Sequence, residues 1–220
     1  MKRFTAALMG ALVLAGCGSV RYPTTYVLNL PPAAPQPGHS PGGLGAVAIR
    51  ELRCPEFLCE GRIVYRNGPV EVGFYQYHRW AMNPREAITQ YLEDGLRAQS
   101  IFRSVGAYER GSETAYVLSG TLERLEEVDV GRNVRAVCTI SAHLLDTGTR
   151  SVVWSHTASE SIVVEKRNVG GVVSSLSAAS RIVADRLLRS MAEELPAMLA
   201  ETGRISSPGE KGAHTVPIQP

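Results

Sequence analysis

The residue with the clearest chemical potential near the start of the chain is Cys17. It ends the run Leu-Ala-Gly-Cys at residues 14–17, which follows an uncharged apolar stretch at residues 4–13. Lys2 and Arg3 come before that stretch. A positive start, an apolar run and small residues form the three-part pattern of a secretory signal, and the run is too short to span a bilayer as a permanent helix. The sequence therefore predicts an exported protein whose signal ends just before Cys17.

The Leu-Ala-Gly-Cys run also resembles the lipobox of bacterial lipoproteins. That resemblance implies removal of residues 1–16 and attachment of acyl chains such as palmitate to the thiol and the new amino group of Cys17. Each buried methylene contributes about 0.8 kcal/mol, so two or more chains hold a protein firmly at a membrane. The alternative is an ordinary signal with a chance cysteine at its end. Lipoproteins kept at the inner membrane often carry Asp after the cysteine, so Gly18 favours the periplasmic face of the outer membrane.

Three further cysteines follow. Cys54 and Cys59 flank four residues and could close a small loop, and an exported protein occupies an oxidising compartment where a disulfide is stable. Free thiols are the second interpretation of this pair. A metal site is the third, but it would need further ligands, and no other Cys or His lies close in sequence. Cys138 lies in an alternating apolar stretch, where we expect it to be a small buried hydrophobic residue.

The residues that could support catalysis do not form a recognised motif. Three histidines lie in expected strands without a neighbouring nucleophile motif: His78, His143 and His156. Asp146 begins an Asp-Thr-Gly triplet like that of aspartic proteases, but that chemistry needs two such carboxylates, and a hairpin turn explains the triplet. The glycines at residues 170–171 lack the lysine and spacing of a phosphate-binding loop. We therefore expect a protein that is not an enzyme and that has no cofactor and no metal.

An aromatic cluster precedes an expected helix and is a candidate partner-facing or lipid-facing patch, because Tyr and Trp are enriched at interfaces. Its residues are Tyr75, Tyr77, Arg79 and Trp80. Strand alternation places Phe74 and His78 on one face of the strand. Tyr75 and Tyr77 then lie on the other face, so part of the cluster must be core. Arg79 in such a place pairs with an acid or stacks on a ring more often than it binds a ligand.

Composition limits the function classes. The formal net charge is +2, and loss of Lys2 and Arg3 with the signal brings it to zero. This balance gives no reason to expect a nucleic acid partner. The length suits one domain with a substantial core. Residues 17–45 are expected to form the lipidated cysteine, a tether, a short strand and a flexible Pro/Gly-rich linker, because five prolines and four glycines fall within residues 31–45.

Periodicity predicts the elements of the domain at residues 46–203. Short strands with branched and aromatic residues are expected at 26–30, 46–52, 62–66, 70–78 and 101–105. Asn67-Gly68 predicts a hairpin turn. Asn83, followed by a proline and then a glutamate, predicts the N-cap of a helix that ends near Gln99. Alternation over residues 115–128, 134–145 and 151–164 predicts an antiparallel meander.

A long amphipathic helix is predicted at residues 174–199, with Pro196 kinking or ending it. Small residues on this helix permit close approach of another subunit in a homo-oligomer: Ala178, Ala179 and Ala184. Residues 204–220 are rich in Pro, Gly and charge and are expected to be disordered. The sequence therefore predicts an α+β fold, in which an antiparallel sheet carries two packed helices.

The chain resembles the ABC-type transport auxiliary lipoprotein family over roughly residues 26–199. The matching pieces are the lipobox, Tyr-Val-Leu at 26–28, Ala-Val-Ala-Ile at 46–49, Arg-Ile-Val-Tyr-Arg at 62–66, Tyr-His-Arg-Trp-Ala at 77–81 and Ile-Phe at 101–102. The resemblance implies a non-catalytic, outer-membrane component of a lipid transport system. Its implied partners are a substrate-binding protein of the MCE type and the ABC permease and ATPase. The pair Cys54 and Cys59 is not a general feature of the family.

A different class of function is the alternative. A structural or assembly lipoprotein that binds a cell-wall or secretion partner would share the lipid anchor and the lack of a catalytic motif. A periplasmic hydrolase, the third hypothesis, lacks the nucleophile motif it would need.

Overall fold

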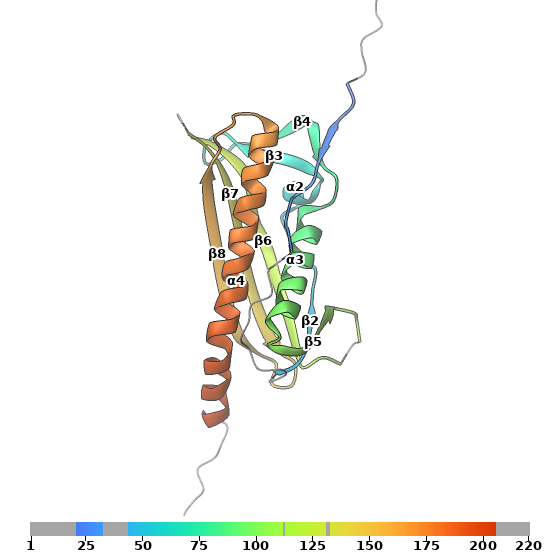
Figure 1. Ribbon diagram of the computed structural model, residues 1–220, viewed down its shortest axis with the longest axis vertical. Coiled ribbons are helices and arrows are strands. Elements are labelled where there is room, and N and C mark those ends of the chain that lie inside the picture. The colour runs from blue at the N-terminus through green and yellow to red at the C-terminus, as the bar shows by residue number, and fades with distance from the viewer. Residues whose placement is uncertain (1–20, 33–43, 112, 131–132, 206–220) are drawn as a thin grey trace, which may run out of the picture.

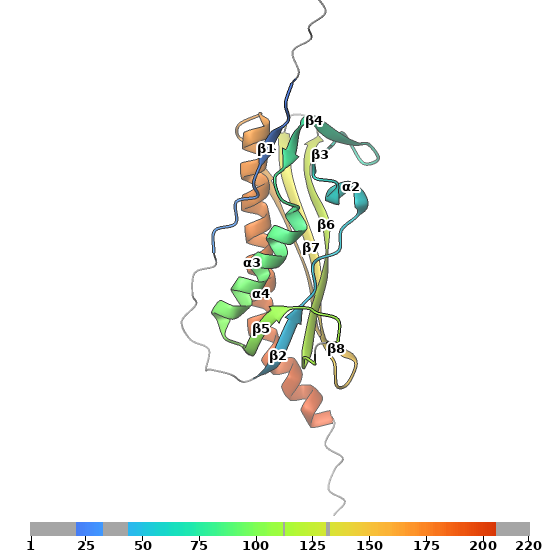
Figure 2. The ribbon, with the colours of Figure 1, turned by 90° about the vertical axis from the view of Figure 1, so that its right-hand side faces the viewer.

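The computed structural model describes residues 21–32, 44–111, 113–130 and 133–205. Its elements, in chain order, are β1 (Thr24–Tyr26), β2 (Leu44–Ile49), α2 (Glu56–Cys59), β3 (Arg62–Arg66), β4 (Val72–Trp80), α3 (Pro84–Gln99), β5 (Phe102–Ala107), β6 (Tyr116–Val130), β7 (Asn133–Asp146), β8 (Ser151–Val163) and α4 (Val169–Ile205). The strands form one sheet, and α3 and α4 pack side by side on one of its faces (Figures 1 and 2). The α+β class predicted from the sequence is confirmed. Within the described residues, no helix is both long and apolar enough to cross a membrane.

The backbone of the sheet is the long antiparallel meander β6–β7–β8, which the alternating pattern predicted. The remainder of the sheet is different from the prediction. β3 pairs in parallel with the second half of β6, and β2 pairs in parallel with its first half. β1 is parallel to β4, and β5 is parallel to β2. The sheet therefore mixes parallel and antiparallel pairs. β6 has fifteen residues, so the edge that does not pair with β7 is long enough for two short strands, one after the other.

The first strands are shifted from their predicted positions. β1 ends at Tyr26, and the chain after it leaves the sheet and packs on α4, where Leu28 is buried and the amide of Asn29 donates to Ser177 Oγ at 3.0 Å. β2 begins at Leu44, within the expected linker, and ends at Ile49. The lipobox cysteine and the linker residues 33–43 lie outside the described residues.

The local signals around α3 are confirmed. Asn83 Oδ1 accepts a hydrogen bond from the amide of Arg85 at 3.2 Å, and Pro84 occupies the first turn of the helix. The helix ends at Gln99, where Ser100 takes a left-handed conformation with φ of 53°. The face of α3 with three-and-four spacing is buried against the sheet and α4, as expected for an amphipathic helix.

Helix α4 is longer than predicted. It begins at Val169 and continues to Ile205, so Pro196 lies inside it and does not end it. Pro196 is exposed in the C-terminal part of the helix, and its ring removes one backbone hydrogen-bond donor there. The apolar stripe of α4 fills the core against β7 and β8 through Leu176, Val183, Leu187, Met191 and Leu195. The predicted disordered tail lies, from residue 206 on, outside the described residues.

Candidate functional site

The aromatic cluster of β4 is divided by an irregularity in strand pairing. The register between β3 and β4 shifts, so that Val64 lies opposite Phe74 whereas Arg62 lies opposite Arg79. Five residues of β4 therefore span the length of two residues of β3, and simple alternation does not hold between them. The prediction that Tyr75 and His78 lie on opposite faces is wrong, because their rings are in edge contact with centroids 5.8 Å apart.

Tyr75 forms a largely internal contact. Its ring meets Tyr65 edge-on at 5.3 Å, and its hydroxyl donates to Glu127 Oε2 at 2.5 Å. Burial raises the pKa of Glu127, the hydrogen bond from Tyr75 opposes that shift, and the charge of Asp129 adds to it. Burial and the neighbouring carboxylate of Glu127 also raise the pKa of Tyr75. The two groups satisfy each other, so Tyr75 links β4 to β6 and presents no free hydroxyl to a partner.

The other three members of the cluster have different environments. Trp80 is only 7% exposed and belongs to the core, which removes it from the predicted surface patch. Tyr77 and Arg79 are exposed on β4. Only these two of the four predicted residues are thus placed to meet a lipid or a protein partner.

Four exposed side chains with large apolar parts lie on or beside the β1–β4 strand pair. Because β1 runs beside β4, the first described residues lie along this strand, and the Arg21 guanidinium lies 6.0 Å from the Tyr77 ring centroid. Tyr22 is 83% exposed, and Val27 and Met82 are also exposed beside the β1–β4 pair. We call Tyr22, Val27, Tyr77 and Met82 the N-terminal apolar patch. Tyr22, Val27 and Met82 were not predicted from the sequence, because single apolar residues outside a periodic run carry no signal.

The predicted cysteine loop forms a short helical turn. Cys54 is joined to Cys59 across α2, with their Cα atoms 6.3 Å apart. Asn83 Nδ2 donates to the carbonyl oxygen of Cys59 at 3.1 Å, so this loop is fastened to the cap of α3. Cys138 is fully buried, as predicted, and its burial raises the pKa of its thiol to about 12, which leaves the thiol protonated at neutral pH.

Two of the histidines and Asp146, which could have supported catalysis, have structural contacts in the fold. His78 Nδ1 lies 3.1 Å from the Tyr26 hydroxyl, and His156 stacks on Trp154. Asp146 Oδ1 accepts from the amides of Gly148 and Thr149 at 2.9 Å, which is the predicted hairpin turn. Within the described ranges, no three His, Cys, Asp or Glu side chains group in a way that could hold a metal ion.

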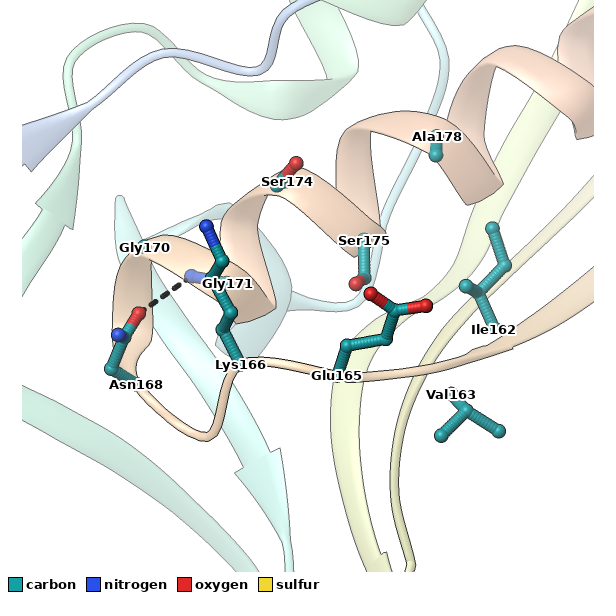
Figure 3. A pocket seen from close by; sticks show the side chains of 10 residues that line it. All are labelled: Ile162, Val163, Glu165, Lys166, Asn168, Gly170, Gly171, Ser174, Ser175 and Ala178. Carbon is teal, nitrogen blue, oxygen red and sulfur yellow. Dashed lines mark hydrogen bonds between the residues drawn. The ribbon is translucent and has the colours of Figure 1, made fainter.

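A hollow of about 570 Å³ lies between the end of β8 and the first turns of α4 (Figure 3). Asn168 Oδ1 accepts from the amide of Gly171 at 2.8 Å at the start of the helix. A second hollow, of about 420 Å³, lies between α4 and the segment after β1. Gly170, Ser174 and Ala178 line both hollows and form a narrow ridge between them.

This ridge is the surface on which α4 could be approached closely by another chain. Ala178 is partly exposed on it, as the sequence analysis expected. Ala179 and Ala184 are buried in the core and are not available for such a contact, which corrects that part of the prediction.

Comparison with solved structures shows the same fold in two other proteins. Protein XCC0632 from Xanthomonas campestris is 17% identical, with a TM-score of 0.69, and the alignment covers 82% of this chain and 99% of that one. The crystal structure of an uncharacterized protein is 15% identical, with a TM-score of 0.60, over 77% of this chain and 99% of that one. The comparison with curated proteins gave no match.

The family assignment comes from the sequence of the folded domain itself. The family model described as the ABC-type transport auxiliary lipoprotein component matches residues 26–188, from the end of β1 to the middle of α4. The matched region includes the whole sheet apart from the first residues of β1, and it covers most of the chain. The protein therefore belongs to the family of ABC-type transport auxiliary lipoprotein components.

Proposed function

We propose that this protein is an outer-membrane lipoprotein that docks the periplasmic part of an ABC-type lipid transport system and does not itself catalyse a reaction. Its partner in this role is an MCE-domain protein, which connects it to the ABC permease and ATPase. The lipidated Cys17 holds the domain at the periplasmic face, and Gly18 in place of Asp supports the outer membrane as its location. The family to which the chain belongs supports the association with a transporter.

The observation that carries this proposal is the short chain between Cys17 and the folded domain. Arg21 is the first described residue and already lies beside the Tyr77 ring, so only three residues, 18–20, separate the anchor from the domain surface. The four residue steps from position 17 to position 21 span at most about 14 Å of extended chain. A lipidated Cys17 would therefore hold the β1 end of the domain close to the bilayer.

The two ends of the domain suit this arrangement. Figure 1 places the start of β1 at one end of the long axis and the C-terminal end of α4 at the other. The N-terminal apolar patch would face the lipid headgroups, where Tyr side chains are favoured. The C-terminal turns of α4, including the exposed Pro196, would point into the periplasm toward a partner.

Fractionation and co-purification of the full-length protein from cells test the proposal. We expect the wild type to sediment with outer membranes and to retain an MCE-domain protein in mild detergent. The matched control is Gly18→Asp, which should keep the lipid anchor but move the protein to the inner membrane.

A photo-crosslinking residue at position 196 should capture the MCE-domain protein, whereas one at position 22 should label lipid. Capture of a peptidoglycan synthase or a secretion pore, with no transport component, would instead support the structural or assembly lipoprotein. Normal membrane lipid balance and detergent resistance after gene deletion would also contradict the proposal.

A further inference from the structure

A small hollow on the sheet face opposite the two long helices is lined by residues from three segments, two of which supply basic side chains. Its volume is about 290 Å³, and it lies where the chain leaves β2 and passes along β6. We call it the Arg50–Arg53 hollow, and the residues that line it are Arg50, Glu51, Arg53, Ser119, Gly120 and His143.

A backbone bulge places both arginines in the hollow. The amide of Arg50 donates to the Leu118 carbonyl at 2.9 Å, and that of Arg53 donates to the Gly120 carbonyl at 3.0 Å. The three residue steps from Arg50 to Arg53 thus run beside the two steps from Leu118 to Gly120 on β6. Without the extra residue, alternation would turn Arg50 and Leu52 to the same face. Instead Leu52 is buried and its amide donates to Thr89 Oγ1 of α3 at 3.1 Å, while both arginines line the hollow.

The sheet supplies the remaining polar groups. Ser119 of β6 and His143 of β7 lie directly opposite each other in the antiparallel register. Gly120 of β6 lies opposite the segment that carries the two arginines, and only glycine fits there. A Cβ on Gly120 would lie 2.6 Å from the Ser141 carbonyl oxygen and 2.8 Å from the Leu52 side chain. Gly120 therefore allows the arginine-bearing segment to lie directly against the sheet.

The charge in the hollow is positive, and most of it is not neutralised by an acidic side chain of the described residues. The Arg50 guanidinium lies over the Tyr108 ring, 4.1 Å from its centroid, which orders the side chain without neutralising it. Glu51 also lines the hollow, but its carboxylate pairs with Arg85 Nε at 3.1 Å. The side chains of Arg53 and His143 form no hydrogen bond or ion pair with the part of the chain that the structure describes.

We propose that the Arg50–Arg53 hollow binds a phosphate group. Two guanidinium groups, one hydroxyl and one imidazole offer more donors than the two oxygens of a carboxylate readily accept, whereas a terminal phosphate, as a monoester or a free ion, presents three or four oxygens to these four groups. Guanidinium forks match phosphate oxygens in geometry and bind them with charge-assisted hydrogen bonds. The phosphate is either part of a phospholipid headgroup or a free ion. This inference does not depend on the proposed role in transport.

Titration of the purified full-length lipoprotein in neutral detergent tests the inference. One arm uses inorganic phosphate as the probe, and the other uses short-chain phosphatidic acid, a phosphomonoester lipid, with the matching diacylglycerol as the phosphate-free control. We expect Arg53→Gln to weaken binding of the phosphate-bearing probe by about tenfold or more, as for loss of one charge-assisted hydrogen bond. Tighter binding of the lipid identifies a headgroup as the source, and tighter binding of the ion identifies free phosphate.

Arg103→Gln is the matched control, because Arg103 is exposed on β5 and does not line the hollow. It removes the same charge and should leave binding unchanged. Equal weakening by the two substitutions would show general charge attraction and overturn the inference. So would failure of both probes to bind the wild type at millimolar concentration. Unfolding curves of each variant show whether a loss of binding reflects a loss of fold.

Discussion

The contact between Tyr75 and Glu127 shows how one residue pair determines what an aromatic cluster can do. These residues are 52 positions apart, and their partly buried hydrogen bond joins β4 to β6. A buried polar group is costly unless it is paired, so the pair stabilises the sheet only as a unit. Tyr75 is therefore a structural residue, and Tyr77, two positions along, carries the exposed aromatic surface.

The raised pKa of Glu127 predicts a pH dependence of stability. The folded state holds the proton on Glu127 more tightly than the unfolded state, so this group contributes most below its ordinary pKa near 4.5. That contribution is lost as the pH rises through the raised pKa of the folded state. Urea unfolding of wild type and Glu127→Gln across this range measures the effect. The free energy of unfolding of the wild type should fall relative to that of the variant as pH rises, and a difference that does not change with pH would contradict the raised pKa of Glu127.

At the scale of elements, the caps of the two long helices fix where each begins. Asn83 both caps α3 and binds the carbonyl of Cys59 in the disulfide loop. Asn168 accepts from the amide of Gly171 at the start of α4. In each helix a short polar side chain satisfies an amide that the helix itself leaves unpaired.

The double role of Asn83 can be separated by two substitutions. Asn83→Ala removes both hydrogen bonds and should lower the free energy of unfolding by about 0.5–2 kcal/mol, the usual cost of losing an N-cap. Asn83→Asp keeps the acceptor for Arg85 and loses only the bond to Cys59, so it should cost less. Denaturant unfolding under oxidising conditions measures both. Equal losses in the two variants would mean that the cap contributes nothing.

The two adjacent glycines at the start of α4 should respond in opposite ways to alanine. A Cβ on Gly171 would overlap the Lys166 carbonyl oxygen, a backbone atom that cannot move aside. Gly171→Ala should therefore lower the free energy of unfolding by about 1–3 kcal/mol. A Cβ on Gly170 would meet no atom closer than Asn168 Oδ1 at 3.4 Å. Gly170→Ala should therefore leave the free energy of unfolding unchanged or raise it by up to about 1 kcal/mol. Thermal unfolding compares the two. Similar effects in both variants would argue against the tight turn before α4.

At the scale of the whole molecule, the anchor and the fold are separate properties. The core is built within the described domain, and Cys17 precedes it. Acyl chains add membrane affinity by burying methylenes and add nothing to the packing of the sheet and helices.

Loss of the anchor should therefore change location without changing stability. We expect Cys17→Ser to release or mislocalise the protein while its thermal unfolding stays that of the wild-type domain. Membrane fractionation and circular dichroism measure the two properties, with Gly18→Ala as a control that keeps the cysteine. If Cys17→Ser sustains full transport function from the soluble periplasm, the anchor is not required for the proposed role.

The sequence by itself determined the features that depend on neighbouring residues. The meander β6–β8, the hairpin at Asn67-Gly68, the cap at Asn83 and the burial of Cys138 follow from local periodicity and turn chemistry, which act over a few residues. The family resemblance rested on the same local pieces, and the family match confirmed it.

Only the tertiary structure decided which distant segments lie together. The parallel pairing of β2 and β3 with one edge of β6, the shift that brings the rings of Tyr75 and His78 together, and the bulge that groups Arg50 and Arg53 with His143 all depend on register between strands. Alternation specifies which residues share a face of one strand, but it does not specify the partner strand, its direction or an extra residue in the ladder.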